Sequence, residues 1–263
     1  NIYEMKFARG HITQEMRIVG TTDHTGTEVR FKPDPEMFED TVYKYEILHN
    51  RMRQQAFLNA GIQIVIKDER SGCEDEDDLC YTGGIREYVK FINESKNRKP
   101  IHDEVIYLTG TKDDAIAELA IQYTNNDSEE IISFANDVNT PEGGMHETGF
   151  KTALTRIINE YGKKNNIIKT DADKLSGDDV LEGMAAVISV KLPEPQFEGQ
   201  TKQKLGNSYI RTLVSNIVSE QLSEFFEEHP ATAKIILEKA MMANRAREAA
   251  RKAKESVRRK TGL

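Results

Sequence analysis

The feature that most constrains this 263-residue sequence is its end, where residues 231–260 contain neither glycine nor proline. Because these two residues disfavour helices most, the stretch predicts one helix of about 45 Å at 1.5 Å per residue. Pro230 stands just ahead of it, and proline suits the first turn of a helix. Small residues recur at spacings of three and four, which would let this helix lie close to a neighbour: Ala243, Ala246, Ala250, Ala253 and Val257.

Charge is divided unevenly along the chain. The net charge is −8, but residues 231–263 hold ten Lys or Arg and three Glu, so this end carries +7 and residues 1–230 carry −15. An acidic body with a basic end would meet DNA at that end only. The candidate DNA-facing residues step along one side of the predicted helix: Arg247, Arg251, Lys254 and Arg258.

The remaining pattern is a mixture of strands and helices without regular alternation, which predicts two α+β domains. We expect the boundary between them at Thr82-Gly83-Gly84, and a break before the last helix at His229-Pro230. We expect strands at residues 2–8, 12–19, 27–32, 62–66, 105–108, 116–123, 130–138 and 186–190. Of these, 105–108, 116–123 and 130–138 are expected to pair as an antiparallel meander. We expect helices at residues 42–57, 85–95, 150–161, 210–226 and 231–260.

Composition excludes several classes of protein. The chain is 38% apolar and 30% charged, which is typical of a globular protein, and no apolar run reaches the roughly 20 residues of a membrane span. Two cysteines, Cys73 and Cys80, are too few for a disulfide framework and are expected to be reduced thiols. Since the chain opens on Asn1 within a strand-like run, we expect it to be an internal piece of a larger protein.

No metal site or catalytic set is expected from the motifs. His146-Glu147 lacks the second histidine of a zinc-binding helix, and Asp171, Asp173 and Gly177 are wrongly spaced for a calcium loop. There is also no glycine-rich loop ending in Gly-Lys-Ser/Thr.

One loop is more informative. Residues 193–207 contain two prolines and two glycines, and they place Gln200, Lys202 and Lys204 shortly before a predicted helix. An ammonium group on a flexible stem near a helix start is suited to a phosphate group. The residues alone leave the alternative open that these lysines are simply solvated.

The residues of this loop, Gln200-Thr201-Lys202-Gln203-Lys204-Leu205, resemble the Gln-Thr-Lys loop of the ATPase subunits of bacterial type II topoisomerases, gyrase and topoisomerase IV. Further motifs of that family follow in the same order along nearly the whole chain: Gly26-Thr27-Glu28-Val29-Arg30-Phe31, Ala56-Phe57-Leu58-Asn59, Tyr81-Thr82-Gly83-Gly84-Ile85, Gly143-Gly144-Met145-His146-Glu147-Thr148-Gly149-Phe150, Gly177-Asp178-Asp179 with Glu182-Gly183, and Ala246-Arg247-Glu248-Ala249-Ala250-Arg251. Met145 stands where the family has Thr.

The resemblance implies a domain plan. Residues 1–81 would be the C-terminal part of a GHKL-type ATP-binding domain, and 82–230 a transducer domain similar to the second domain of ribosomal protein S5. Residues 231–263 would be a long basic helix leading toward the DNA gate. Thr27 and Val29 would lie at the adenine, and Gln200 and Lys202 would reach the γ-phosphate of ATP.

The resemblance also implies what lies elsewhere. The full subunit would use ATP and Mg²⁺, but the catalytic base, the Mg²⁺-binding Asn and the adenine-reading Asp would precede Asn1. We therefore expect no catalytic residue, no metal and no bound cofactor in this piece alone. The implied partners are the gyrase A protein, DNA and a second copy of the gyrase B protein, with no membrane, and the implied location is the cytoplasm.

Three interpretations compete. The run from Arg247 to Lys254 favours the gyrase B protein over its topoisomerase IV counterpart, which shares nearly all these motifs. The third interpretation is a non-enzymatic DNA-binding or scaffolding module whose basic helix is its whole function.

Overall fold

A computed structural model describes residues 1–73 and 75–261. It divides into two compact units, Asn1–Leu48 and His49–Leu263, and each is described by itself. Among the described residues, no helix combines the length and the apolar content that a bilayer crossing requires.

The first unit contains one antiparallel hairpin, β1 (Ile2–Ala8) with β2 (His11–Gly20), and both strands lie where the sequence predicts strands. Its two-residue turn places Arg9 at φ 49° and Gly10 at φ 79°, the left-handed pair that matches the twist of a hairpin. Large apolar side chains of the hairpin are exposed, among them Tyr3, Phe7 and Met16. Such a hairpin has no covered face within its own unit.

The strand predicted at residues 27–32 is wrong, because this segment forms no strand in the structure. Val29 and Phe31 alternate as in a strand, but they are 78% and 71% exposed and pair with no neighbouring strand among the described residues. A strand needs a partner to satisfy its backbone N–H and C=O groups, and alternation cannot supply one. The next helix, α1 (Tyr45–Leu58), also begins later than predicted, because the Asp40 carboxylate accepts a hydrogen bond from Val42 N and holds a turn there.

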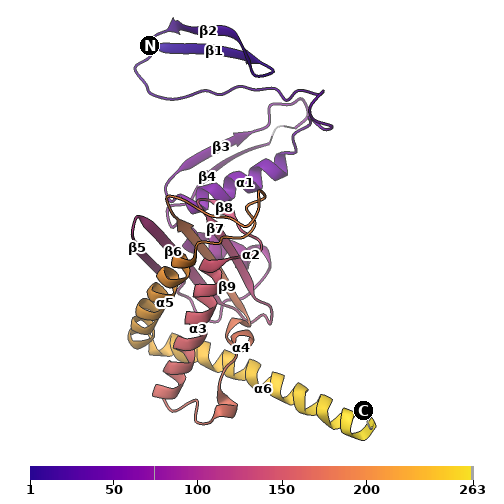
Figure 1. Ribbon diagram of the computed structural model, residues 1–263, viewed down its shortest axis with the longest axis vertical. Helices are drawn as coiled ribbons and strands as arrows, with labels where there is room; N and C mark the ends of the chain where they lie inside the picture. The colour runs from indigo at the N-terminus through magenta and orange to yellow at the C-terminus, as the bar shows by residue number, and fades with distance from the viewer. Residues whose placement is uncertain (74, 262–263) are drawn as a thin grey trace. The chain divides into compact units, whose positions relative to one another are not determined.

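The second unit is built on a five-stranded sheet in the order β5-β6-β9-β7-β8 (Figure 1). Its strands are β5 (Ile106–Lys112), β6 (Ala115–Tyr123), β7 (Glu130–Ala135), β8 (Val138–Asn139) and β9 (Met184–Lys191). The predicted pairing of β5 with β6 is confirmed. The predicted pairing of β6 with β7 is wrong, because β9 lies between them, antiparallel to β6 and parallel to β7. A central position suits β9, whose apolar residues are buried on both faces of the sheet.

Helices cover both faces of this sheet, as Figure 1 shows. On one face Leu119 and Ile188 pack against α3 (Met145–Lys164) and α5 (Ser208–Glu228). On the other, Ala120 and Val187 pack with residues of α1 and α2 (Ile85–Ser95). Neighbouring residues of one strand thus pack on opposite faces of the sheet, because successive side chains of a strand point in opposite directions. Because α1 packs on this sheet, the compact unit begins at His49, well before residue 82. The functional domain boundary expected near residue 82 stays a prediction.

The other elements lie at the margins of the sheet. The hairpin β3 (Gln63–Lys67) with β4 (Glu76–Cys80) connects α1 to α2. A short turn of 3₁₀ helix (Asp171–Asp173) and α4 (Gly177–Leu181) connect α3 to β9. The last helix, α6, runs from Pro230 to Thr261, so both the predicted start at proline and the predicted single helix are confirmed.

Candidate functional site

The family-like loop forms a short hairpin that presents Gln200 and Lys202 at its tip. Phe197 pairs with Leu205 in an antiparallel bridge, and Glu198 N donates to Lys204 O at 2.9 Å. Lys202 N closes the turn on Gly199 O at 3.3 Å, with Gly199 at φ 83° and Lys202 at φ 56°. We call residues 197–205 the Gln-Thr-Lys hairpin. The structure therefore brings Gln200 and Lys202 together on one exposed turn.

The base of this hairpin is fixed to the start of α3. Leu205 is fully buried, and its N–H donates to Gly143 O at 3.1 Å while its carbonyl accepts from Met145 N at 2.9 Å. A Cβ on Gly144 would lie 2.3 Å from Leu205 O, closer than any side chain could come. The paired glycines thus allow two backbones to meet, and the hairpin has a rigid base beneath a solvated tip.

The two lysines of the hairpin differ in their surroundings. Lys204 forms an ion pair with Glu198 at 3.1 Å. Lys202 Nζ lies 5.9 Å from the centre of the Phe197 ring, and among the described residues no carboxylate lies within ion-pair distance of it. At the tip, Lys202 therefore offers a positive charge that the described residues do not neutralise.

Next to the glycines, His146 is fully buried and belongs to the structural base of the site. Its Nε2 is 3.0 Å from Thr140 Oγ1, which is 2.7 Å from Ser133 Oγ. Burial lowers the pKa of His146 to about 4, so the imidazole is neutral near pH 7. This histidine supports the start of α3 and does not reach the hairpin tip.

The predicted adenine residues, Thr27 and Val29, belong to the first unit, where both side chains are exposed in an irregular segment. Between them, Glu28 pairs with Arg30 at 3.4 Å. Their place beside a nucleotide, and relative to Lys202, stays a prediction.

The predicted cations of α6 divide into paired and distal residues. Arg247 donates two hydrogen bonds to Asp179 of α4, from Nε to Oδ1 at 2.8 Å and from Nη2 to Oδ2 at 2.9 Å. Arg251 pairs within its own helix, with Glu248 at 2.8 Å and Glu255 at 3.4 Å. Lys254 and Arg258 lie exposed toward the end of the helix. Arg247 thus has a structural task that the charge pattern did not reveal, and DNA contact by these four residues stays a prediction.

Asp179 belongs to a family-like motif in the sequence, but its contact with Arg247 was not predicted. Its side chain is 2% exposed and accepts further bonds from Ser176 N at 2.8 Å and Asn244 Nδ2 at 3.3 Å. Burial by itself would raise the pKa of Asp179, but the hydrogen bonds from Arg247, Ser176 and Asn244 outweigh it and hold the pKa at about 2. The spacing of Ser176 and Asp179 is that of a capping box, and this signal could have indicated the start of α4.

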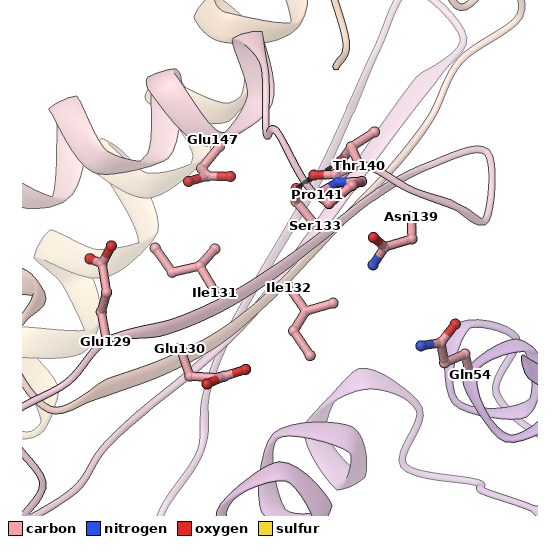
Figure 2. A pocket seen from close by; sticks show the side chains of 10 residues that line it. All are labelled: Gln54, Glu129, Glu130, Ile131, Ile132, Ser133, Asn139, Thr140, Pro141 and Glu147. Carbon is pink, nitrogen blue, oxygen red and sulfur yellow. Dashed lines mark hydrogen bonds between the residues drawn. The ribbon is translucent and has the colours of Figure 1, made fainter. Parts of the chain in front are cut away.

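A pocket of about 470 Å³ opens beside β7, between α1 and the start of α3 (Figure 2). Its three carboxylates are ion-paired: Glu129 and Glu147 with Lys151 at 3.5 and 2.9 Å, and Glu130 with Lys96 at 2.6 Å. None of the predicted site residues lines it. Among the described residues, no group of three or more His, Cys, Asp or Glu side chains is placed to hold a metal ion.

This fold is that of the ATPase region of type II topoisomerases. The 43K ATPase domain of Thermus thermophilus gyrase B, solved with an aminocoumarin, is 38% identical with a TM-score of 0.82, over 96% of this chain and 68% of that one. The topoisomerase IV ATP-binding domain of Francisella tularensis, solved with a small-molecule inhibitor, is 25% identical with a TM-score of 0.78, over 94% of this chain and 66% of that one.

A family model described as DNA gyrase B matches residues 84–256, and the chain belongs to the DNA gyrase B family. The DNA gyrase B protein of Staphylococcus epidermidis strain RP62A is 50% identical over all 263 residues, which cover 41% of that protein. The corresponding protein of Streptococcus pneumoniae strain TIGR4 is 49% identical and is covered to 40%. The chain thus spans about two fifths of the length of these relatives, and the identities favour gyrase over topoisomerase IV.

Proposed function

We propose that this chain is the part of a gyrase B protein that senses the terminal phosphate of ATP and passes the nucleotide state toward DNA. The supporting observation is Lys202, an exposed cation without a carboxylate partner among the described residues, on a hairpin whose base is buried. Such a base keeps the ammonium group in place without neutralising it. Gln200 on the same turn would add a neutral hydrogen-bond donor.

The contact is useful because it differs between nucleotide states. An interaction can shift a conformational equilibrium only if its strength differs between the two states. Lys202 and Gln200 would bind the triphosphate and lose their partner in the diphosphate, and the domain that carries them would respond. In the parent protein this response would couple ATP hydrolysis to strand passage and negative supercoiling.

The proposal extends to partners and location. Residues 1–81, with Thr27 and Val29 at the adenine, would complete an ATP-binding domain, 82–230 would be the transducer, and 231–263 would lead to the DNA gate. The parent protein would act in the cytoplasm with the gyrase A protein, DNA and a second copy of gyrase B. Nucleotide phosphates suit the cationic hairpin tip. We propose no Mg²⁺ ligand in this chain, because the family resemblance places the Mg²⁺-binding Asn before Asn1.

Replacing Lys202 in the full-length protein tests this function. We expect Lys202→Ala to lower ATP hydrolysis and supercoiling by about 100-fold, in the range seen when one charge-stabilising donor is removed from an active site. The circular dichroism spectrum should not change, because the side chain is exposed.

Lys204→Ala is the matched control, since Lys204 lies on the same hairpin but pairs with Glu198. Its activity should stay within about twofold of wild type. Normal turnover by Lys202→Ala would refute the proposal.

A further inference from the structure

The turn between β7 and β8 holds an unusual conformation. Asn136 and Asp137 follow one another at φ 48° and φ 61°, in the left-handed region that favours glycine. A two-residue hairpin turn requires this pair of angles, and asparagine followed by glycine is its preferred sequence. Asp137 occupies the glycine position, as Asp114 does at φ 61° in the turn between β5 and β6. The observations that point to a role are therefore the side-chain contacts of Asn136 and Asp137.

On one side, the turn is bound to the strand that leads into the Gln-Thr-Lys hairpin. The Asn136 side chain donates to Leu192 O at 2.8 Å and accepts from Leu192 N at 2.8 Å, and Asn136 N donates to Val190 O at 2.8 Å. Leu192 is buried and immediately precedes the loop at residues 193–207. Asn136 therefore fixes the point at which this loop leaves the sheet.

On the other side, the turn is bound to α1. The Asp137 carbonyl accepts from Arg51 Nη2 at 2.9 Å and from Gln55 Nε2 at 3.2 Å. Its carboxylate accepts from Asn59 Nδ2 at 3.3 Å. Three side chains, two on α1 and one on the residue that follows it, thus reach Asp137 at spacings of one helical turn.

A lysine joins the two sides. Lys191 ends β9, and its Nζ donates to Asn59 Oδ1 at 3.0 Å. The same Nζ is 3.8 Å from Asp137 Oδ1, a buried oxygen with no hydrogen-bond partner among the described residues. A buried carboxylate oxygen without a hydrogen bond is costly, so a small shift of α1 would let Lys191 exchange its hydrogen bond to Asn59 for one to Asp137. The ammonium group has two acceptors within a short movement.

We propose that Asn136 and Asp137 are positioning residues that hold the start of the loop at residues 193–207 against α1, so that a shift of α1 moves Lys202 in the Gln-Thr-Lys hairpin. This inference rests on the proposed role of Lys202 at the terminal phosphate. It adds a path of direct contacts from α1 through Asp137 and Lys191 to Leu192. None of these residues needs to touch the nucleotide.

Asn136→Gly in the full-length protein tests this role, because glycine accepts the left-handed angle and removes only the side-chain clamp. The measurement is the ratio of Kd for ADP to Kd for a non-hydrolysable ATP analogue. We expect Asn136→Gly to lower this preference for the triphosphate about tenfold, while the Kd for ADP stays within about twofold.

Asn166→Gly is the matched control, because Asn166 also has a left-handed angle, φ 56°, but is exposed at the end of α3. It should leave the ratio unchanged. A ratio for Asn136→Gly equal to wild type would overturn the inference. So would an equal loss in both glycine variants, which would indicate a general loss of structure.

Lys202→Ala, measured in the same way, separates the inference from the proposed function. If Lys202→Ala abolishes the triphosphate preference and Asn136→Gly does not, only the positioning role fails. If Lys202→Ala leaves the preference intact, the proposed function fails.

Lys191→Met should lower the ratio like Asn136→Gly, and Lys191→Arg should restore most of it, because the guanidinium group can still reach both acceptors. Loss without rescue by Arg would contradict the link through Lys191.

Discussion

The Gly-Gly-Met-His-Glu-Thr-Gly-Phe motif, residues 143–150, supports the base of the Gln-Thr-Lys hairpin but does not lie at its tip. Gly144 allows contact with Leu205, and Gly149 allows contact with α5, since a Cβ there would lie 2.4 Å from Arg211 O. Phe150 fills the core. His146 closes a buried chain of hydroxyl groups through Thr140. The motif is therefore a platform for the hairpin, and its histidine is a titratable group in the interior.

His146 should make stability depend on pH. Its pKa is about 4 in the folded chain because burial disfavours the charged ring, against about 6.5 when unfolded. Because the pKa is lower in the folded state, the unfolded state binds the proton first as the pH falls. Stability is thus complete above about pH 6.5 and falls as the pH drops toward 4, by about 2 kcal/mol at pH 5. Urea unfolding measured between pH 8 and pH 5 would show this loss.

His146→Gln supplies the comparison, because glutamine can still bond to Thr140 but does not titrate in this range. Burial also lowers the pKa of His102, so part of the slope should remain in the variant. An unchanged slope in His146→Gln would show that His146 does not titrate as described.

Between elements, the Asp179–Arg247 pair fastens α4 to α6. Asp179 is bound within α4 by its capping box and reaches across to Arg247 and Asn244 of α6. A bidentate pair fixes direction as well as distance. The contact therefore orients the long helix where it leaves the body of the unit.

Arg247→Ala should lower the free energy of unfolding by about 2 kcal/mol, because the buried Asp179 carboxylate would lose its only bidentate partner among the described residues. Arg247→Lys should recover at most half of this, since lysine cannot form the fork. The stabilisation is present above about pH 4 and is lost toward pH 2, because the pKa of Asp179 is lowered to about 2. Urea unfolding at pH 7 measures the loss.

Arg251→Ala on the same helix is the control, because the exposed Arg251 pairs, among the described residues, with Glu248 and Glu255 of its own helix. Such pairs contribute at most about 1 kcal/mol. Equal effects of Arg247→Ala and Arg251→Ala would argue against the fastening of α4 to α6.

Elements with local signals and the pairing of the adjacent strands β5 and β6 were predictable from the sequence, whereas pairing between distant segments was not. Pro230 and the stretch without glycine or proline indicate α6 by themselves, and the glycines around residue 200 indicate a loop. The position of β9 between β6 and β7 is set by pairing across distant segments, which an apolar run cannot specify. For the same reason Arg247 could be seen as a cation but not as the partner of Asp179, which is 68 residues away.

At the scale of the whole molecule, the uneven charge limits where DNA could approach. Residues 1–230 carry −15 and would repel a duplex, whereas residues 231–263 carry +7. Along α6, the buried positions end at Asn244, and Arg247 and Arg251 pair with acidic residues. Lys254, which is exposed and has no ion-pair partner among the described residues, is therefore the cation of α6 to test for contact with phosphate groups.

Lys254→Ala decides whether the end of α6 meets DNA, because this exposed lysine has no ion-pair partner among the described residues. The observable is the slope of log K for duplex DNA against log salt, measured with this chain by filter binding. Each lost phosphate contact reduces the slope by about 0.9, so Lys254→Ala should lower it by about that amount.

Lys234→Ala is the control, because Lys234 lies at the start of the same helix and pairs with Glu238 at 3.8 Å. It should leave the slope unchanged. Equal slopes in all three proteins would remove Lys254 from the DNA surface. A wild-type slope that indicates six or more contacts would instead favour a DNA-binding module, since the few distal cations of α6 could not supply them.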